Sequence, residues 1–529
     1  MKNIIKIFAA SALLAVSACS DDFIENEPYT ERVPENFYQT PEDAYEGLVA
    51  VYDALQREGY GGFLMSTEIA SDNCYGGFGT ADNQVALDWD RFEFGSDLEM
   101  NEPVWRICYL GIYRANVLLE NLDRVDWGEN TDLRTTYEAE ARFLRAHFHF
   151  ELARMFGEIV PLESTLTPEE FESPRAPAEE TYALIANDFL FAAQNLSDAN
   201  YSLNSSPNYG RVTKWAAEAY LAKAFLFYTD YYETEDLAGV VNKQQATEYI
   251  NDVVNNSGHE LLPEYGSLWL AAAAADTTIT YAGEGNREMV FAIRYNSSGN
   301  GEWALNEGNR FTVNIAPRGS NIGPYAYGWG GATVTPDLYN AYQAGDTRRN
   351  ATIIDFAAEG LDFDPEDRGQ RQYTGYAWKK YAPITNEAGE AVVAAGGGDI
   401  QIDNFEDYAV IRFSEVLLMA AELNMGTDDA FAQQALDRVR ERAFGDDTHD
   451  IALTKENIMM ERRLELALEG KRYFDLIRWS LEIAEQQIEE TDLGGEFNVD
   501  FRPETQGWFP LPQSQILLSN GAIEQNPGW

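Results

Sequence analysis

The stretch "EAEARFLRAHFHFELARMF" at residues 138–156 has the strongest helical pattern in the chain and decides the fold class. The apolar side chains of this region form two stripes with helical spacing instead of one. The first stripe consists of Leu133, Tyr137, Ala141, Leu144, Phe148, Leu152 and Met155, and the second of Ala139, Phe143, Ala146, Phe150 and Ala153. A helix that is apolar on two sides must be covered on both, so we expect it to lie between neighbouring helices. The pattern predicts a mainly α protein.

Helical signals continue on both sides of this stretch. Thr40 followed by Pro41 is typical of a helix start, and Gly445 is placed to end a helix. Further helical patterns are found at 41–55, 182–196, 215–226, 406–424, 428–444 and 454–485. No strict internal repeat is visible, but the succession of helices predicts stacked helical hairpins.

The character of the chain changes between residues 261 and 405. Glycine, asparagine, tyrosine and tryptophan dominate there, and short β-like runs such as "EMVFAIRY" at 288–295 appear. Irregular segments on a rigid frame commonly carry binding residues. We therefore predict an N-terminal helical region at 37–260, a loop-rich binding insertion at 261–405 and a C-terminal helical region at 406–529.

The first residues have the layout of a secretory signal followed by a lipid attachment site. Lys2 and Lys6 accompany an apolar run that is too short to span a bilayer. "VSAC" at 16–19 resembles the bacterial lipobox, which implies cleavage before Cys19 and its acylation. The acidic residues that follow resemble the tag of surface-exposed outer-membrane lipoproteins in Bacteroidetes. We expect residues 1–18 to be a lipoprotein signal peptide and 19–36 a lipidated tether; a plain signal with a chance cysteine is the alternative.

The chain is strongly acidic, with a formal net charge of −50. Nucleic-acid binding requires a basic surface, so nucleic acid is excluded as a partner. The same charge disfavours polyanionic ligands unless a local basic pocket overrides it. A hydrophobic content of 45% and an aromatic content of 13% indicate a folded chain. Cys74 and Cys108 could pair, but a chain of this length does not depend on one disulfide.

No catalytic or metal-binding constellation stands out. His147 and His149 point to nearly opposite sides of a helix, and His147 with Glu151 is interpreted as a core pair. The acidic loop "LDFDPEDRG" at 361–369 lacks the glycine that a calcium loop needs. Nucleophile elbows, phosphate loops and zinc helices are missing. We predict no catalytic residue, no metal and no cofactor.

Motifs in sequence order resemble one family. They are "PVWRICYLGIYRANVLLENL" (103–122), "EAEARFLRAHFHFELARMFGEIVPL" (138–162), "IRFSEVLLMAAELN" (411–424), "ERRLELALEGKRYFDLIRW" (461–479) and "WFPLPQSQILLSNGAIEQNPGW" (508–529). Together with the lipobox, they resemble the SusD/RagB family of surface nutrient-binding lipoproteins. The resemblance runs across nearly the whole mature chain.

This resemblance implies a fold of four helix pairs, similar to tetratricopeptide repeats, that supports an irregular ligand-binding region. It also implies that the protein captures oligosaccharide and acts as a lid on a SusC-like TonB-dependent transporter in the outer membrane. The net charge favours a neutral glycan. Two alternatives stay open: a RagB-like protein that binds peptides, and a surface glycoside hydrolase.

The first candidate binding stretch is "GPYAYGWGGATVTPDLYNAY" at 323–342. Tyr325, Tyr327 and Trp329 alternate among glycines, and flat rings suit the C–H faces of sugars. Residues two apart in an extended segment point the same way, which predicts a row of ring platforms with Trp329 as the first choice. The alternative is a glycine-rich loop whose rings pack inward. The family resemblance favours binding, since ligand aromatics of the family tend to precede a stretch like that at 337–348.

The second candidate stretch is "ASDNCYGGFG" at 70–79. Asp72 and Asn73 could bond sugar hydroxyls while Tyr75 and Phe78 stack on the ring. The resemblance implies that this loop and the later one face each other across the ligand. A tight turn with ordinary core aromatics is the alternative.

Overall fold

The computed structural model describes residues 37–57, 60–82, 84–93, 101–167, 170–199, 210–297 and 307–529. The predicted signal peptide, the tether and Cys19 lie outside these residues. In the described ranges, no helix is both long and apolar enough to cross a membrane. The same ranges contain no cluster of three or more His, Cys, Asp or Glu side chains that could hold a metal ion.

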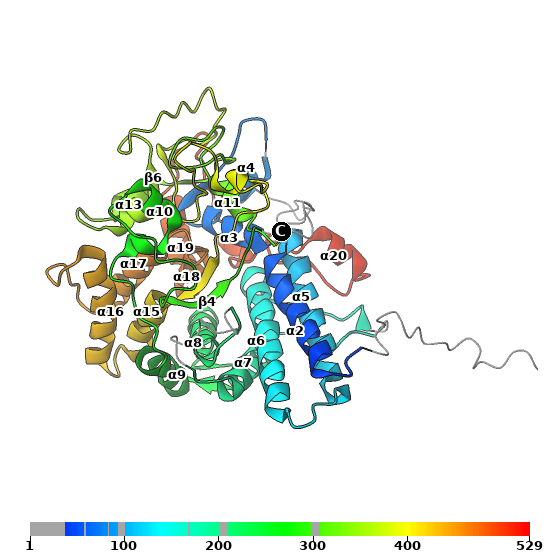
Figure 1. Ribbon diagram of the computed structural model, residues 1–529. Helices are drawn as coiled ribbons and strands as arrows, with labels where there is room; N and C mark the ends of the chain where they lie inside the picture. Colours follow the sequence, from blue (N-terminus) through cyan, green and yellow to red (C-terminus); the bar gives the residue numbers. More distant parts are fainter. Residues whose placement is uncertain are drawn as a thin grey trace, which may run out of the picture.

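Long helices packed side by side form the frame of the molecule, along the lower part of Figure 1. In order of contact they are α2 (Pro41–Gln56), α5 (Asn101–Asn121), α6 (Thr131–Phe156), α7 (Ala178–Asn195), α8 (Lys214–Tyr231), α9 (Lys243–Asn256), α15 (Phe413–Asn424) and α16 (Asp429–Phe444). Helix α9 packs directly on α15, so the frame continues across the whole loop-rich stretch. The predicted mainly α fold with stacked helical hairpins is confirmed.

Helix α6 is the central element of this frame. Its side chains from Ala139 to Phe156 are all buried except that of Arg142, and α5 and α7 cover it on two sides. Each buried large apolar side chain contributes roughly 1.5–3 kcal/mol relative to exposure, so both stripes stabilise the stack. The double stripe in the sequence therefore corresponds to a helix enclosed by others.

The ends of the frame helices follow the local sequence. The Thr40 hydroxyl accepts a hydrogen bond from the Asp43 N–H (3.2 Å), and the Asp43 carboxylate accepts one from the Thr40 N–H (2.9 Å). This capping box starts α2 as predicted. Helix α16 ends at Phe444 and is capped by Gly445, whose φ of 79° lies in the left-handed region.

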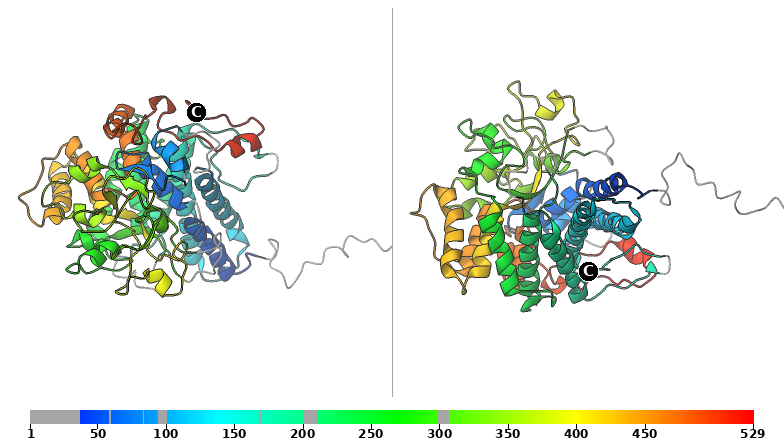
Figure 2. Two further views of the ribbon diagram at one scale, coloured as in Figure 1. Left: turned by 90° about the horizontal axis from the view of Figure 1, so that it is seen from above. Right: turned by 60° about the horizontal axis from the view of Figure 1, so that its bottom comes forward.

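Short elements fill the remainder of the chain. Further helices are α3 (Tyr60–Ile69), α4 (Gln84–Asp90), α10 (Leu270–Ala275), α11 (Phe311–Ile315), α12 (Pro336–Ala341), α13 (Arg348–Thr352), α14 (Val392–Ala395), α17 (Lys455–Leu466), α18 (Arg472–Trp479), α19 (Leu481–Glu489) and α20 (Gln513–Leu518). Antiparallel two-stranded sheets pair β1 (Cys74–Gly77) with β5 (Gly331–Val334), β2 (Asp236–Leu237) with β3 (Val241–Asn242), β4 (Met289–Ile293) with β8 (Tyr408–Arg412), and β6 (Ile353–Asp355) with β7 (Tyr376–Trp378). Figure 2 shows the loop-rich segments gathered on one face of the helices.

Two helical patterns near the C-terminus differ from the prediction. The pattern at 406–424 begins as strand β8, because this run pairs with β4, and becomes helical only at Phe413. The pattern at 454–485 is divided into α17, α18 and α19. Between α17 and α18, Gly470 has a φ of 70° and its N–H donates to Glu68 Oε1 (2.6 Å). A continuous helix could not make this contact, so tertiary structure overrides the helical periodicity here.

A buried cluster of charges ties the loop-rich segments to the C-terminal helices. Arg412, at the end of β8, lies 2.6 Å from Glu288 and 3.0 Å from Glu465. A second guanidinium nitrogen of Arg412 lies 2.7 Å from Glu469. The cluster also includes the pairs Arg348–Asp346, Arg348–Glu461, Arg442–Glu288 and Arg442–Glu465. These side chains are buried, so each charge depends on its protein partners.

Cys74, Cys108, His147 and His149 belong to the core. Cys74 and Cys108 are buried and are not bonded to each other. The Tyr220 hydroxyl bonds His147 Nδ1 (2.7 Å), and burial lowers the pKa of His147 to about 4. The interpretation of His147 and Glu151 as a core pair is confirmed, since both side chains are buried.

Candidate ligand-binding site

The two candidate stretches lie side by side although they are far apart in the sequence. Strands β1 and β5 pair with Cys74 opposite Val334 and Gly77 opposite Gly331. The Phe78 N–H extends the ladder by donating to the Gly330 carbonyl (2.7 Å). Because these strands are hydrogen-bonded to each other, a ligand cannot lie between them there, and any binding surface must be at their rim.

Asp72 and Asn73 do not reach that rim. The Asp72 carboxylate accepts hydrogen bonds from Arg472 (2.7 and 2.8 Å) and lies 3.0 Å from Arg463. The Asn73 amide donates to Glu68 Oε2 (3.0 Å). Both side chains are buried, so the prediction that they bond sugar hydroxyls is wrong. Instead, they fasten the turn before β1 to the C-terminal helices.

Tyr75 and Phe78 are also core residues, and the prediction that they stack on a ligand is wrong. The Tyr75 hydroxyl donates to the Thr491 carbonyl (2.7 Å), and its ring packs edge-on against Phe497. The Phe78 ring covers Gly331, where a Cβ atom would lie 2.4 Å from it. Gly331 therefore serves close packing and does not expose a ring to ligand.

The three predicted ring platforms have different environments. Tyr325 is buried, and its hydroxyl donates to Glu359 Oε2 (2.6 Å), so this ring is an anchor and its predicted binding role is wrong. Tyr327 and Trp329 keep part of their side chains exposed. These two rings remain candidates for ligand contact.

Trp329 is held by its backbone on both sides. Its N–H donates to the Val313 carbonyl (2.8 Å), and its carbonyl accepts from Arg318 Nη1 (3.0 Å). Arg318 in turn lies 2.8 Å from Asp82. A backbone segment fixed in this way loses little conformational freedom on binding, which favours ligand affinity.

Strand β1 rests on a buried acid. Asp90 is buried and accepts a hydrogen bond from Gln372 Nε2 (2.5 Å), while Gln372 Oε1 accepts from the Gly77 N–H (2.8 Å). Burial raises the pKa of Asp90 to about 8. The folded protein therefore keeps the Asp90 proton at neutral pH, whereas the unfolded chain loses it near pH ~4.

We expect Asp90 to make the free energy of unfolding depend on pH. Between these two pKa values the folded state binds one proton more, so stability falls as pH rises, by about 1.4 kcal/mol per pH unit for this group. Asp90→Asn removes this contribution. Urea midpoints measured from about pH 5 to about pH 7.5 should fall less steeply for the variant, which should be the more stable protein at the upper end. If the urea midpoints of both proteins fall equally steeply with pH, the raised pKa of Asp90 is contradicted.

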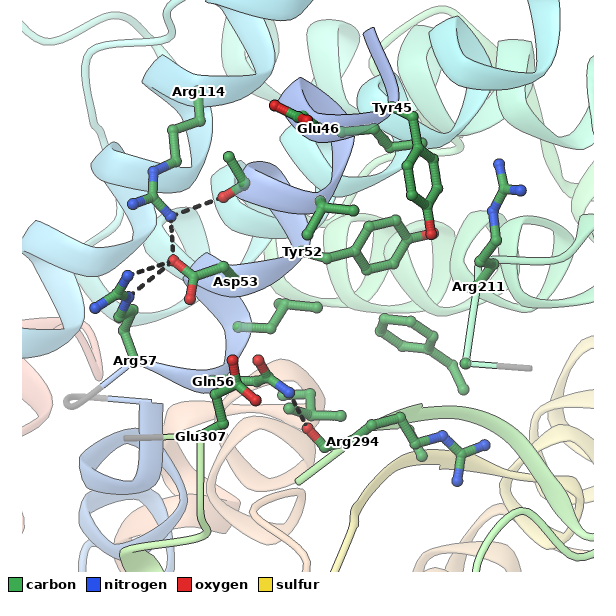
Figure 3. Close-up of a pocket in the computed structure, with 18 residues that line it drawn as sticks. Tyr45, Glu46, Tyr52, Asp53, Gln56, Arg57, Arg114, Arg211, Arg294 and Glu307 are labelled. Atoms are coloured by element: carbon green, nitrogen blue, oxygen red, sulfur yellow. Dashed lines mark hydrogen bonds and ion pairs between the residues drawn. The ribbon is translucent and has the colours of Figure 1, made fainter. Parts of the chain in front are cut away.

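A second surface of interest is a pocket of about 570 Å³ beside α2, drawn in Figure 3. Helix α2 contributes one wall, and β4 and Arg211 contribute another. Tyr45 and Val49 line it and are each 46% exposed. Phe291 and Ile293 add apolar surface. Rings and apolar groups with a few polar side chains are the composition of small-molecule sites.

The polar groups of this α2 pocket are held by ion pairs and hydrogen bonds. Asp53 lies 2.7 Å from Arg57 and 2.6 Å from Arg114. The Tyr52 hydroxyl donates to Glu140 Oε2 (2.6 Å), and burial raises the pKa of Tyr52 well above its usual value. Figure 3 shows Tyr52, Asp53, Arg57 and Arg114 around the cavity. The pocket is therefore preformed.

Our sequence interpretation missed the α2 pocket. The core-facing stripe of α2 predicts the helix, while the adjacent face, about 100° around the axis, carries Tyr45, Val49, Tyr52 and Gln56 at spacings of four, three and four residues. Rings at helical spacing on a face that does not belong to the core stripe were the available signal.

Comparison with known proteins agrees with this architecture. A family model described as "SusD family" matches residues 364–529, and one described as "Starch-binding associating with outer membrane" matches residues 22–226. The chain resembles the SusD/RagB family at both of its ends. The predicted resemblance is thus confirmed by matches at both ends of the SusD-like chain.

Individual relatives match this SusD-like chain over nearly its whole length. A "SusD-like protein" of Bacteroides ovatus is 26% identical over 90% of this chain and 83% of its own. The structure of a "Laminarin binding SusD-like protein" is 28% identical, with a TM-score of 0.75 over 93% of this chain and 100% of that one. "Surface glycan-binding protein A from Bacteroides fluxus" is 25% identical, with a TM-score of 0.77 over 93% and 100%.

Proposed function

We propose that this protein captures oligosaccharide at the cell surface and delivers it, as a lid, to a SusC-like TonB-dependent transporter in the outer membrane. The observation that carries the proposal is the chain-wide similarity to a protein named for laminarin binding. The similar structures named here are glycan-binding proteins, and we propose no catalytic step.

The binding chemistry follows from the exposed rings. Trp329 and Tyr327 are the two predicted platforms that remain partly exposed, and a flat ring can cover the C–H face of a sugar. A net charge of −50 favours a neutral glycan, and laminarin is a neutral glucan. The α2 pocket offers a second place where rings and polar groups meet. We propose that Trp329 contributes most of the affinity.

The proposed location follows from the N-terminal sequence and from the family. Acylation of Cys19 would tether the fold to the outer membrane, and durable anchoring needs more than one acyl chain. The second family model is described as associating with the outer membrane, which supports this location.

Delivery as a lid predicts a stable complex with the transporter. Affinity purification of the tagged protein from detergent-solubilised native membranes should recover a large outer-membrane barrel protein in stoichiometric amount. The acylation-deficient variant Cys19→Ser should leave the membrane fraction, while the purified protein keeps its glycan affinity. Recovery of the wild type without any barrel protein would contradict the lid role.

A further inference from the structure

A second large cavity lies in the loop-rich part of the molecule. It has a volume of about 680 Å³ and is formed by α10, α13, β6 and the end of α16. In Figure 1, α10, α13 and β6 lie together on the side of the molecule above α16. None of the residues that line this cavity lines the α2 pocket, and neither Trp329 nor Tyr327 belongs to it. Its volume is within the range of sites for small organic ligands.

Two consecutive arginines at this cavity have opposite environments. Arg348 is buried and pairs with Asp346 (2.7 Å) and Glu461 (2.5 Å). Arg349 lines the cavity and is partly exposed. No hydrogen bond or ion pair joins the Arg349 guanidinium to a residue that the structure describes, and its buried Nε has no partner there. The Arg349 guanidinium is thus a cation without a paired carboxylate among the described residues, in a chain whose net charge is −50.

Aromatic rings hold the Arg349 side chain in place. Its guanidinium carbon lies 5.0 Å from the centre of the Tyr339 ring. Tyr339 stacks on Tyr376 with ring centres 4.0 Å apart, and its hydroxyl donates to Asp355 Oδ2 (2.7 Å). A guanidinium that rests on a ring keeps its N–H groups free at the edge of its plane, where they can bind an oxyanion.

The other cations of the cavity already have partners. Lys379 lies 2.9 Å from Glu359 and donates to the Asn350 carbonyl (2.6 Å). Arg442 pairs with Glu288 (3.1 Å) and Glu465 (2.6 Å). Arg349 is therefore the cation of this cavity that is available to a ligand.

The carboxylates of the cavity are likewise engaged by neighbouring donors. Asp355 accepts from Tyr339 and from the backbone N–H groups of residues 357 and 358. Asp276 accepts from the Thr278 hydroxyl and N–H. Glu359 accepts from Tyr325 as well as from Lys379, and the fourth acid, Glu264, accepts from the Ser267 hydroxyl (3.3 Å). These acids do not compete directly for Arg349.

We propose that this cavity is a second saccharide site, in which Arg349 binds a carboxylate or sulfate group carried by a sugar. Guanidinium binds both oxyanions through paired N–H donors. The cavity is much larger than an inorganic anion requires, so the sugar ring that bears the group has room beside it. The proposal rests on the proposed function in that the ligand is a glycan, but it uses residues separate from Trp329.

The test is titration of the purified protein with glucuronate, glucose 6-sulfate, glucose and inorganic sulfate, monitored by calorimetry. The wild type should bind at least one of the two anionic sugars saturably, more tightly than inorganic sulfate, and should not bind glucose. Comparison of glucuronate with glucose 6-sulfate identifies which oxyanion the site prefers. Arg349→Gln should weaken this binding by ~10-fold or more, because a charge-assisted pair of hydrogen bonds is lost.

Two further variants make the result specific to this cavity. Ala275 lines the cavity and is exposed, so Ala275→Trp should obstruct the site without removing any charge. Arg287→Gln is the matched control, because Arg287 is 47% exposed, pairs with Glu260 and lies outside the cavity. Arg287→Gln and the wild type should bind the anionic sugars with equal affinity.

Three results would overturn the proposal: no saturable binding of either anionic sugar, equal affinities of wild type and Arg349→Gln, or inorganic sulfate binding as tightly as the sugars. Failure of the proposed function is distinguishable from these results. If the protein does not bind laminarin but binds glucuronate, only the proposed function is rejected and the second site stands. Trp329→Ala should leave the affinity for the anionic sugars unchanged.

Discussion

Replacing Arg412 by alanine is expected to lower the free energy of unfolding by about 3–5 kcal/mol. Arg412 is buried and lies within 3.0 Å of carboxylate oxygens of Glu288 and Glu465. Removing the guanidinium leaves these acids buried without one of their main counter-charges. A buried charge that loses its partner costs far more than the pair contributes in net stability, and this explains the size of the effect.

The matched control for this variant is Arg287→Ala. Arg287 and Glu260 form an exposed ion pair at 2.8 Å, with side chains 47% and 56% exposed. Exposed pairs contribute about 0–1 kcal/mol, so this substitution should scarcely move the urea midpoint. The two midpoints are measured by circular dichroism. Equal small shifts for both variants would mean that the buried cluster does not hold the loop-rich segments on the helices.

Replacing Trp329 by alanine is expected to reduce laminarin affinity by ~30-fold, or ~2 kcal/mol, the loss typical of a central aromatic contact. The ring is partly exposed and its backbone is fixed by Val313 and Arg318. Affinity electrophoresis in gels that contain laminarin measures the change, because a bound protein migrates more slowly.

Two variants make this result interpretable. Trp529→Ala removes another partly exposed tryptophan, one that packs on Arg502 at the end of the chain, and should migrate like the wild type. Tyr45→Ala measures the contribution of the α2 pocket to laminarin affinity, and we expect a smaller loss of affinity than for Trp329→Ala. If laminarin retards Trp329→Ala as much as the wild type but no longer retards Tyr45→Ala, the laminarin site lies in the α2 pocket and not at Trp329.

The long helices could be predicted from the sequence because their signal is local. The double stripe of α6 repeats over many turns, and the start of α2 follows from Thr40, Pro41 and Asp43. Strands β1 and β5 offered no such signal, since each has four residues and its partner lies far away in the chain. The break after α17 depends on the contact between Gly470 and Glu68, which no periodicity reveals.

The candidate site was only partly predictable for the same reason. Tyr325 and Trp329 have similar neighbours in the sequence, but Glu359 draws the first ring inward and the second stays at the surface. Asp72 looks like an available polar group until Arg472, from the other end of the chain, is placed beside it. Local composition selected the region as a candidate, and distant charges decided which of its side chains remain exposed.

The central claim is that this SusD-like chain binds a neutral glycan, and direct titration tests it. Calorimetric titration of the mature wild-type protein with laminarin oligosaccharide should give saturable heat, with none for a mixed peptide digest under the same conditions. Heat from the peptides and none from the oligosaccharide would contradict the account and favour a RagB-like peptide-binding role.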